Sequence, residues 1–192
     1  YRAVGSGEFA GVITAAWAPG MFLNQASEGA GKWRIAQMPA WSAGGHEVSE
    51  SGGSSLAILS SSKKADAAYK FMAYALHNKD AVMSRVDQGG FPADLESMKN
   101  DKFLNQTTMV NTKGETVEYF GGQKFNAVFA EAAKNVVTGF EFLPYDVYAR
   151  SIFTDTVGAA YMGQGTLMDG VKAWQAKLVE QGRSQGFTVK EG

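Results

Sequence analysis

The sequence contains no cysteine among its 192 residues, and it contains only two histidines. The lack of thiols excludes disulfides, zinc–thiolate sites and cysteine nucleophiles together. His46, with Glu47 and Glu50 nearby, could suggest a metal site. No second histidine lies near it and the spacing matches no standard site, so we expect a solvated polar loop, with neither a metal nor a cofactor.

An excess of charge of one sign is also lacking. The chain carries 18 basic and 19 acidic residues, mixed along its length, for a net charge of -1. This balance gives no electrostatic footprint for nucleic acid or for an anionic membrane. Long apolar runs are absent too, since the longest is far short of the roughly 20 residues that a membrane span needs.

What the sequence does contain is an ordinary apolar content of 45%, with four tryptophans and seven tyrosines. A chain of this length can bury a substantial core, as one large domain or as parts of two. Short apolar or alternating runs at residues 12–17, 33–38 and 56–59 predict three strands. Helical patterns dominate after the third of them.

Trp17 stands at the end of the first predicted strand, directly before Ala18-Pro19-Gly20. Proline cannot donate to a ladder and glycine permits a turn, so the strand should end there. Binding residues often lie at such strand ends, where a rigid scaffold meets an open loop. A tryptophan buried in the core is the alternative interpretation.

The third predicted strand follows a polar turn, Ser51-Gly52-Gly53-Ser54. Two adjacent glycines allow positive φ angles and let another surface approach the backbone amides closely. The turn closes a stretch from Pro39 to Ser55 that has no periodicity. A loop of this length in a compact domain is usually functional or mobile.

Helices are predicted over residues 66–77, from about residue 80, over 94–99, from 125 to 136, over 145–161, and after a cap at Thr166. The predicted core contacts of the second helix are Val82, Met83 and Val86, and Trp174 is expected in the core from the last helix. Ser60 and Lys63 fit the S-x-x-K signature of penicillin-recognising enzymes. The S-D-N and K-T-G partner motifs do not occur, so we interpret the serines and lysines as a helix cap and a solvated turn.

Several stretches stand in an order that points to one family. They are Ala16-Trp17, the segment 33–39, Ser51-Gly52-Gly53-Ser54 before 56–59, the segment 62–71, Gly89-Gly90-Phe91-Pro92-Ala93, Phe120-Gly121-Gly122-Gln123, and Pro144-Tyr145 with Tyr148. In this order and spacing the sequence resembles the C-terminal half of an extracellular solute-binding protein of a carbohydrate ABC transporter. The resemblance covers nearly the whole chain, although no single stretch is specific.

The resemblance implies an incomplete α/β fold of the periplasmic-binding-protein type II. It assigns residues 1–56 to the first part of the C-terminal lobe, 57–108 to a segment of the N-terminal lobe, and 109–192 to the helical return of the C-terminal lobe. We expect the rest of the N-terminal lobe to come from a second chain or from a larger product. The implied location is extracytoplasmic, in the periplasm or lipid-anchored at the outer cell surface.

The function implied by the resemblance is that of a non-catalytic sugar-binding component. It would capture an oligosaccharide in a cleft between two lobes and deliver it to an ABC permease in the membrane. Trp17 looks like the aromatic platform for a sugar ring, and the turn would offer amides and a hydroxyl to sugar hydroxyls. The implied ligand-binding residues are Trp17, Gly52, Gly53 and Ser54, followed by Trp41, Tyr145, Tyr148 and Arg150, for which a core or surface role is an equal alternative.

Two other classes of function stay open. A glycosidase would need two carboxylates about 5 to 10 Å apart, and Glu47 with Glu50 or Asp94 with Glu96 are the close acidic pairs near the candidate loops. A non-sugar interaction module is the third possibility, and it predicts no sugar binding at all. We expect no catalytic residue and no enzymatic activity.

Overall fold

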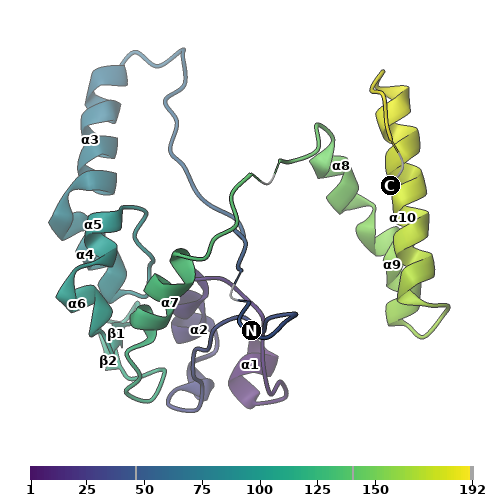
Figure 1. The fold of residues 1–192 in the computed structure, drawn as a ribbon. Coiled ribbons are helices and arrows are strands. Elements are labelled where there is room, and N and C mark those ends of the chain that lie inside the picture. Colours follow the sequence, from purple (N-terminus) through teal and green to yellow (C-terminus); the bar gives the residue numbers. More distant parts are fainter. Residues whose placement is uncertain (46, 140, 191–192) are drawn as a thin grey trace. The chain divides into compact units, whose positions relative to one another are not determined.

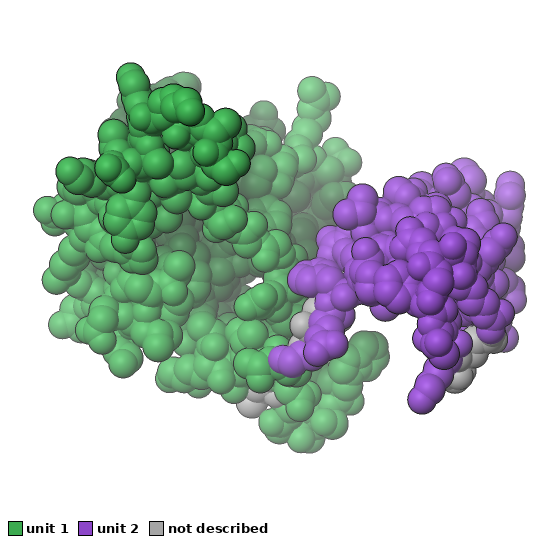
Figure 2. All heavy atoms as spheres, turned by 90° about the horizontal axis from the view of Figure 1, so that it is seen from above, with its two compact units in different colours: residues 1–138 green, residues 139–192 purple. Residues whose placement is uncertain are grey.

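A computed structural model describes residues 1–45, 47–139 and 141–190. The described chain forms two compact units, residues 1–138 and residues 139–192, which Figure 2 distinguishes by colour. Each unit is described separately below. The three segments predicted for the two lobes do not coincide with this division, and their assignment to lobes stays a prediction.

The first unit begins with three short helical elements: α1 (Arg2–Ser6), α2 (Ala18–Gln25) and η1 (Ser27–Gly29) (Figure 1). They pack on a two-stranded antiparallel hairpin of β1 (Met109–Val110) and β2 (Thr116–Val117), which the sequence did not predict. Burial raises the pKa of the core residue Tyr119 to about 12, and its hydroxyl donates to the Ala26 carbonyl at 2.7 Å. The buried cluster consists of Val4, Ala18, Phe22, Leu23, Ala26, Met109, Tyr119, Phe120 and Phe125.

A second apolar cluster joins four helices of the same unit. These are α4 (Lys79–Asp87), α5 (Leu95–Met98), α6 (Asp101–Leu104) and α7 (Phe125–Ala133). The helix predicted from about residue 80 is confirmed, with Val82, Met83 and Val86 buried as expected. The helix predicted at 94–99 is confirmed as α5, whereas α6 was not predicted.

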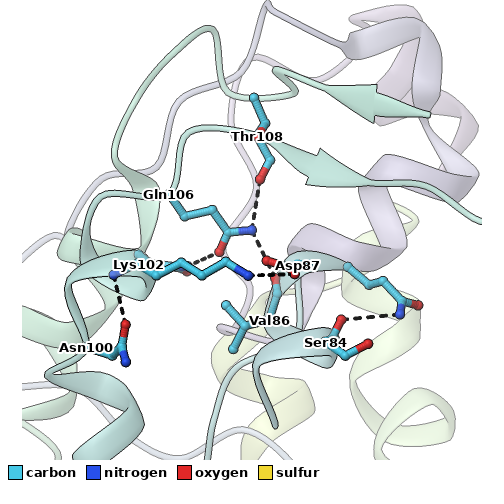
Figure 3. A network of polar contacts seen from close by, with 9 residues as sticks. Ser84, Val86, Asp87, Asn100, Lys102, Gln106 and Thr108 are labelled. Carbon is cyan, nitrogen blue, oxygen red and sulfur yellow. Dashed lines mark hydrogen bonds and ion pairs between the residues drawn. The ribbon is translucent and has the colours of Figure 1, made fainter. Parts of the chain in front are cut away.

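Gln106 holds these helices to the hairpin through its side-chain amide. The Nε2 atom donates to the Val86 carbonyl at 3.0 Å and to the Thr108 carbonyl at 2.8 Å (Figure 3). Its Oε1 atom accepts from Asn126 Nδ2 at 2.7 Å, which satisfies a side chain that is buried in α7. One amide therefore links the end of α4, the start of the hairpin and α7.

None of the three predicted strands forms as a strand in the described chain. The run at 12–17 is irregular and carries an Ile13 that is 75% exposed, and the run at 56–59 is extended with a Leu59 that is 76% exposed. An apolar run becomes a strand only where a neighbour supplies hydrogen bonds, and no described strand lies beside either run. The prediction of buried strands here was therefore wrong for this chain.

The segment 33–38 keeps the alternation that suggested a half-exposed strand, with Trp33, Ile35 and Gln37 turned inward. A side chain takes the place of the missing neighbour. The Ile35 amide donates to Gln123 Oε1 at 2.8 Å, and Gln123 Nε2 donates to the Ile35 carbonyl, also at 2.8 Å. Both backbone groups of Ile35 are therefore satisfied without a second strand.

Helix α3 (Ala65–His77) confirms the helix predicted at 66–77. None of its residues is buried, although the predicted stripe requires it to face a core. Figure 1 shows the extended chain that leads from the body of the unit to this helix. The aromatic and aliphatic side chains exposed on α3 are Tyr69, Phe71, Tyr74 and Leu76.

The second unit contains α8 (Asp146–Ser151), α9 (Phe153–Tyr161) and α10 (Leu167–Ser184). The single helix predicted over 145–161 is two helices that meet at Ile152. The cap predicted at Thr166 is confirmed, because its side chain and that of Asp169 form a reciprocal capping box. Trp174 is partly buried, with its ring against Phe153 at 5.2 Å and its indole N–H donating to the Ala149 carbonyl at 2.7 Å.

Candidate functional site

Trp17 is fixed at its backbone by the start of α2. It is the N-cap residue of that helix, and the next two residues, Ala18 and Pro19, are buried. A proline in the first turn suits a helix start, because the amides there have no partner within the helix. The side chain itself is 46% exposed, so the prediction of an accessible ring fits better than the alternative of a core tryptophan.

The edge of the Trp17 ring meets the glycine turn. Its Nε1 atom donates a hydrogen bond to the Ser51 carbonyl at 2.8 Å. A methyl group built on Gly52 would lie 3.7 Å from the same Nε1 atom. Trp17 and Ser51 are 34 residues apart in the sequence. The predicted aromatic platform and the predicted glycine turn are therefore neighbours in the first unit.

The turn has the backbone geometry that its glycines predicted. Gly52 has a φ of 90° and Gly53 a φ of 136°, both in the region that side chains disfavour. Gly52, Gly53 and Ser54 are all exposed, and their amides are available to a ligand beside the ring. An exposed indole next to exposed amides and a hydroxyl can cover the C–H face of a sugar and bind its hydroxyls.

The other aromatic residue suggested in this unit, Trp41, is fully exposed on the segment before the turn. The structure gives no contact that joins it to Trp17. His46 lies outside the described residues, and Glu47 and Glu50 are exposed. Among the residues that the structure describes, no group of three or more acidic or histidine side chains could hold a metal ion.

Tyr145, Tyr148 and Arg150 all belong to the second unit. The Tyr145 ring lies 6.0 Å from Phe187, and its hydroxyl occupies the space that a side chain on Gly182 would need. Tyr148 is half-buried on α8.

Arg150 is exposed, and its Nε donates to the Asp146 carboxylate at 2.6 Å. Its guanidinium also lies over the Phe142 ring at 5.8 Å. The second unit therefore gives Tyr145 and Arg150 local structural roles, and the part of all three candidates in ligand binding stays a prediction.

Of the acidic pairs considered for catalysis, Asp94 and Glu96 lie at the start of α5. The Asp94 carboxylate caps α5 and accepts from the Ser97 amide at 2.7 Å. This hydrogen bond lowers the pKa of Asp94, which favours the ionised form rather than a proton donor. Glu96 follows it in the first turn of α5.

Sequence reasoning missed the acceptor that fixes Trp17. The acceptor is the backbone carbonyl of Ser51, and a carbonyl is common to every residue, so composition cannot single it out. It also missed the role of Gln123, whose amide replaces a strand. The Phe120-Gly121-Gly122-Gln123 stretch was a signal for a turn, but nothing in it identified Ile35 as the partner.

Comparison with known proteins gives a match to one protein family and a match to a solved structure. The sequence model of the family described as bacterial extracellular solute-binding protein matches residues 1–82. A solved structure of the ABC transporter associated binding protein from B. animalis subsp. lactis Bl-04, in complex with beta-1,6-galactobiose, is 44% identical with a TM-score of 0.84. The match covers 99% of this chain and 46% of the solved chain, so the chain spans about half the length of that relative. No curated protein matches.

The described helices include none long and apolar enough to cross a membrane. The matched family and the solved relative are both binding proteins. The largely helical chain is a partial α/β fold of the solute-binding type, as the resemblance implied. The chain therefore belongs to the bacterial extracellular solute-binding proteins.

Proposed function

We propose that this chain is part of the sugar-binding component of an ABC importer, located outside the cytoplasm. The observation that carries the proposal is the exposed Trp17 ring, held by its edge beside the Gly52-Gly53 turn. The binding of beta-1,6-galactobiose by the relative supports a small oligosaccharide as the ligand. A ring face and a set of backbone amides suit a pyranose, which presents one apolar face and a rim of hydroxyls.

The protein captures its ligand without catalysis and passes it to a permease in the membrane. A complete site needs a second lobe, because the chain spans only about half of its relative. The exposed apolar side chains of α3 support this, since such a face normally packs against other protein. We propose that the second lobe is supplied by the same protein or by a separate chain. Intact mass spectrometry of the purified protein distinguishes these sources, because it shows whether a companion polypeptide is present.

Isothermal calorimetry of the full-length protein with beta-1,6-galactobiose and a panel of related disaccharides tests the function. We expect binding, and we expect Trp17→Ala to weaken it by about 10- to 100-fold with an unchanged fold, because an aromatic stacking surface is lost. Phe9→Ala is a matched control, since Phe9 is an aromatic of similar exposure, 52%, in the same unit. Unchanged affinity in Trp17→Ala would sink the platform assignment.

A hydrolysis assay on the same disaccharides tests the absence of catalysis. We expect intact sugar after prolonged incubation, because the Asp94 carboxylate caps a helix and both Glu47 and Glu50 are exposed to solvent. Detection of monosaccharide products would replace the proposal with a carbohydrate-active enzyme.

A further inference from the structure

The chain between the first unit's body and α3 is held at few points. Before the glycine turn, Val48 is paired with the segment after α7: its amide donates to the Asn135 carbonyl at 3.0 Å, and the Val137 amide donates to its carbonyl at 2.9 Å. After the turn, the first backbone bond is the local one from the Ser62 amide to the Leu59 carbonyl at 2.9 Å. Residues 49–58 lie between these two anchors.

One side chain holds this intervening segment. Among the described residues, the bond from Trp17 Nε1 to the Ser51 carbonyl is the only hydrogen bond that residues 49–58 make. Residues 49–57 are all exposed, so apolar burial does not replace the missing bonds. Two adjacent glycines with positive φ add conformational freedom to this segment.

The Trp17 side chain is well suited to hold a mobile segment. Its backbone is fixed by the buried start of α2, so the indole N–H is presented from a rigid base. The hydrogen bond uses only the edge of the ring, which leaves ring surface exposed. The edge and the face of one indole can therefore act on different partners at the same time.

We propose that Trp17 is a positioning residue as well as a ligand contact: its indole N–H holds residues 49–58 against the first unit, so that the Gly52 and Gly53 amides stand beside the ring face. The inference rests on the proposed function for the identity of the ligand, but the hydrogen bond from Trp17 to the Ser51 carbonyl is present without any sugar. Because a sugar that stacks on the ring also meets this turn, ligand binding and the position of the segment leading to α3 are coupled through one side chain.

Trp17→Phe separates the two roles, because phenylalanine keeps an aromatic face and has no N–H. We expect Gly52 and Gly53 to lose backbone order in this variant, measured without sugar as a fall in the heteronuclear ¹⁵N NOE of their amides. The amides of α2 should be unchanged. Trp41→Phe is the matched control, because Trp41 is fully exposed and its loss should leave the turn unaffected. Unchanged order at Gly52 and Gly53 in Trp17→Phe overturns the inference.

A second measurement uses the protein without substitutions, so it tests the inference even if the Trp17→Phe variant does not fold. The indole N–H of Trp17 should exchange with solvent at least about fivefold more slowly than that of Trp41, because it is hydrogen-bonded. Equal exchange at the two indoles also overturns the inference.

Sugar titration then separates this inference from the proposed function. We expect beta-1,6-galactobiose affinity to fall by about 3- to 10-fold in Trp17→Phe, less than in Trp17→Ala, because the face is kept and the ordered turn is lost. Added sugar should restore part of the NOE of Gly52 and Gly53. If the unaltered protein binds no sugar and the turn is still ordered by Trp17, the proposed function fails and the positioning role stands.

Discussion

At the scale of single residues, two main chains approach each other closely at Gly20 and Gly89. Gly20 lies in α2 and Gly89 in the loop after α4, and a side-chain carbon on Gly89 would lie 2.7 Å from both the Gly20 amide nitrogen and the Met109 sulfur. A carbon on Gly20 would lie 2.8 Å from the Gln88 carbonyl oxygen. The contact joins segments 69 residues apart, and only glycine on both sides permits it.

Gly89→Ala should therefore destabilise the protein by roughly 2 to 5 kcal/mol, since it adds strain at a φ of 84° to a backbone clash. Gly114→Ala is the matched control: its φ is 81°, and nothing lies within 4 Å of the added carbon. That control should lose only about 1 kcal/mol. Urea unfolding of both variants measures the difference, and equal losses would show that the close contact contributes nothing.

Single residues also show which features of the site can be predicted from the sequence and which cannot. Trp17 and Gly52 were singled out by residue type and position, whereas their predicted roles in ligand binding came from the family resemblance. Their direct contact was not predicted, because it depends on a backbone carbonyl and on the path of the intervening chain. The same is true of Gln106 and Gln123, whose amides bond to carbonyls and amides of distant residues.

At the scale of elements, three of the helices with a capping side chain were predicted, whereas α6, which Asn100 caps, was not. Asn78 accepts from the Asp80 and Ala81 amides, and Asp94 and Thr166 cap α5 and α10 in the same way. A cap is a local interaction between neighbours in sequence, so the sequence contains most of its information. A strand depends on a partner elsewhere, and the runs at 12–17 and 56–59 failed for that reason.

The cap of α10 should make this helix sensitive to acid. The Thr166 side-chain hydroxyl donates to the Asp169 carboxylate at 2.7 Å, and this bond lowers the pKa of Asp169 below its ordinary 3.8. A lowered folded-state pKa means that the stabilisation is present above the unfolded pKa and is lost as the pH falls through the folded pKa. Circular dichroism from about pH 6 to about pH 2 should show helix loss at the acid end.

Asp169→Asn should reduce helicity at neutral pH and flatten the part of the acid response that Asp169 contributes. Thr166→Ser is the matched control, because serine keeps the capping hydroxyl and should keep the pH response. The same loss of helix signal at low pH in the protein without substitutions, in Asp169→Asn and in Thr166→Ser would show that the capping box does not stabilise α10.

At the scale of the whole molecule, the exposed face of α3 is the feature that a complete globular protein would not show. Phe71 and Tyr74 are each at least 60% exposed, although their spacing of three residues places them on one face of the helix, as in a helix that packs on a core. The chain is 44% identical to the solved ABC transporter associated binding protein, and it spans 46% of that protein's length. A sequence predicts that such a face is buried, but it cannot show what covers it.

This face should make the 192-residue chain self-associate when it is alone in solution. We expect Phe71→Lys with Tyr74→Ser to lower the weight-average mass in sedimentation and to reduce binding of an apolar dye. Leu95→Lys is the matched control, because Leu95 is 69% exposed in the same unit but lies on α5. If the control lowers self-association as much as the α3 variant, the α3 face is not responsible.

The amide of Gln123 has a consequence for aggregation. Extended segments with free backbone groups can template the addition of a strand from another molecule. The segment around Ile35 is protected from this on one side, because the Gln123 side chain occupies both its N–H and its carbonyl. Residues 56–58 make no hydrogen bond within the described chain and carry an exposed Leu56. Intermolecular β-structure in this protein should therefore begin at residues 56–58, before α3. It should not begin at the segment around Ile35, whose backbone groups are bonded to Gln123.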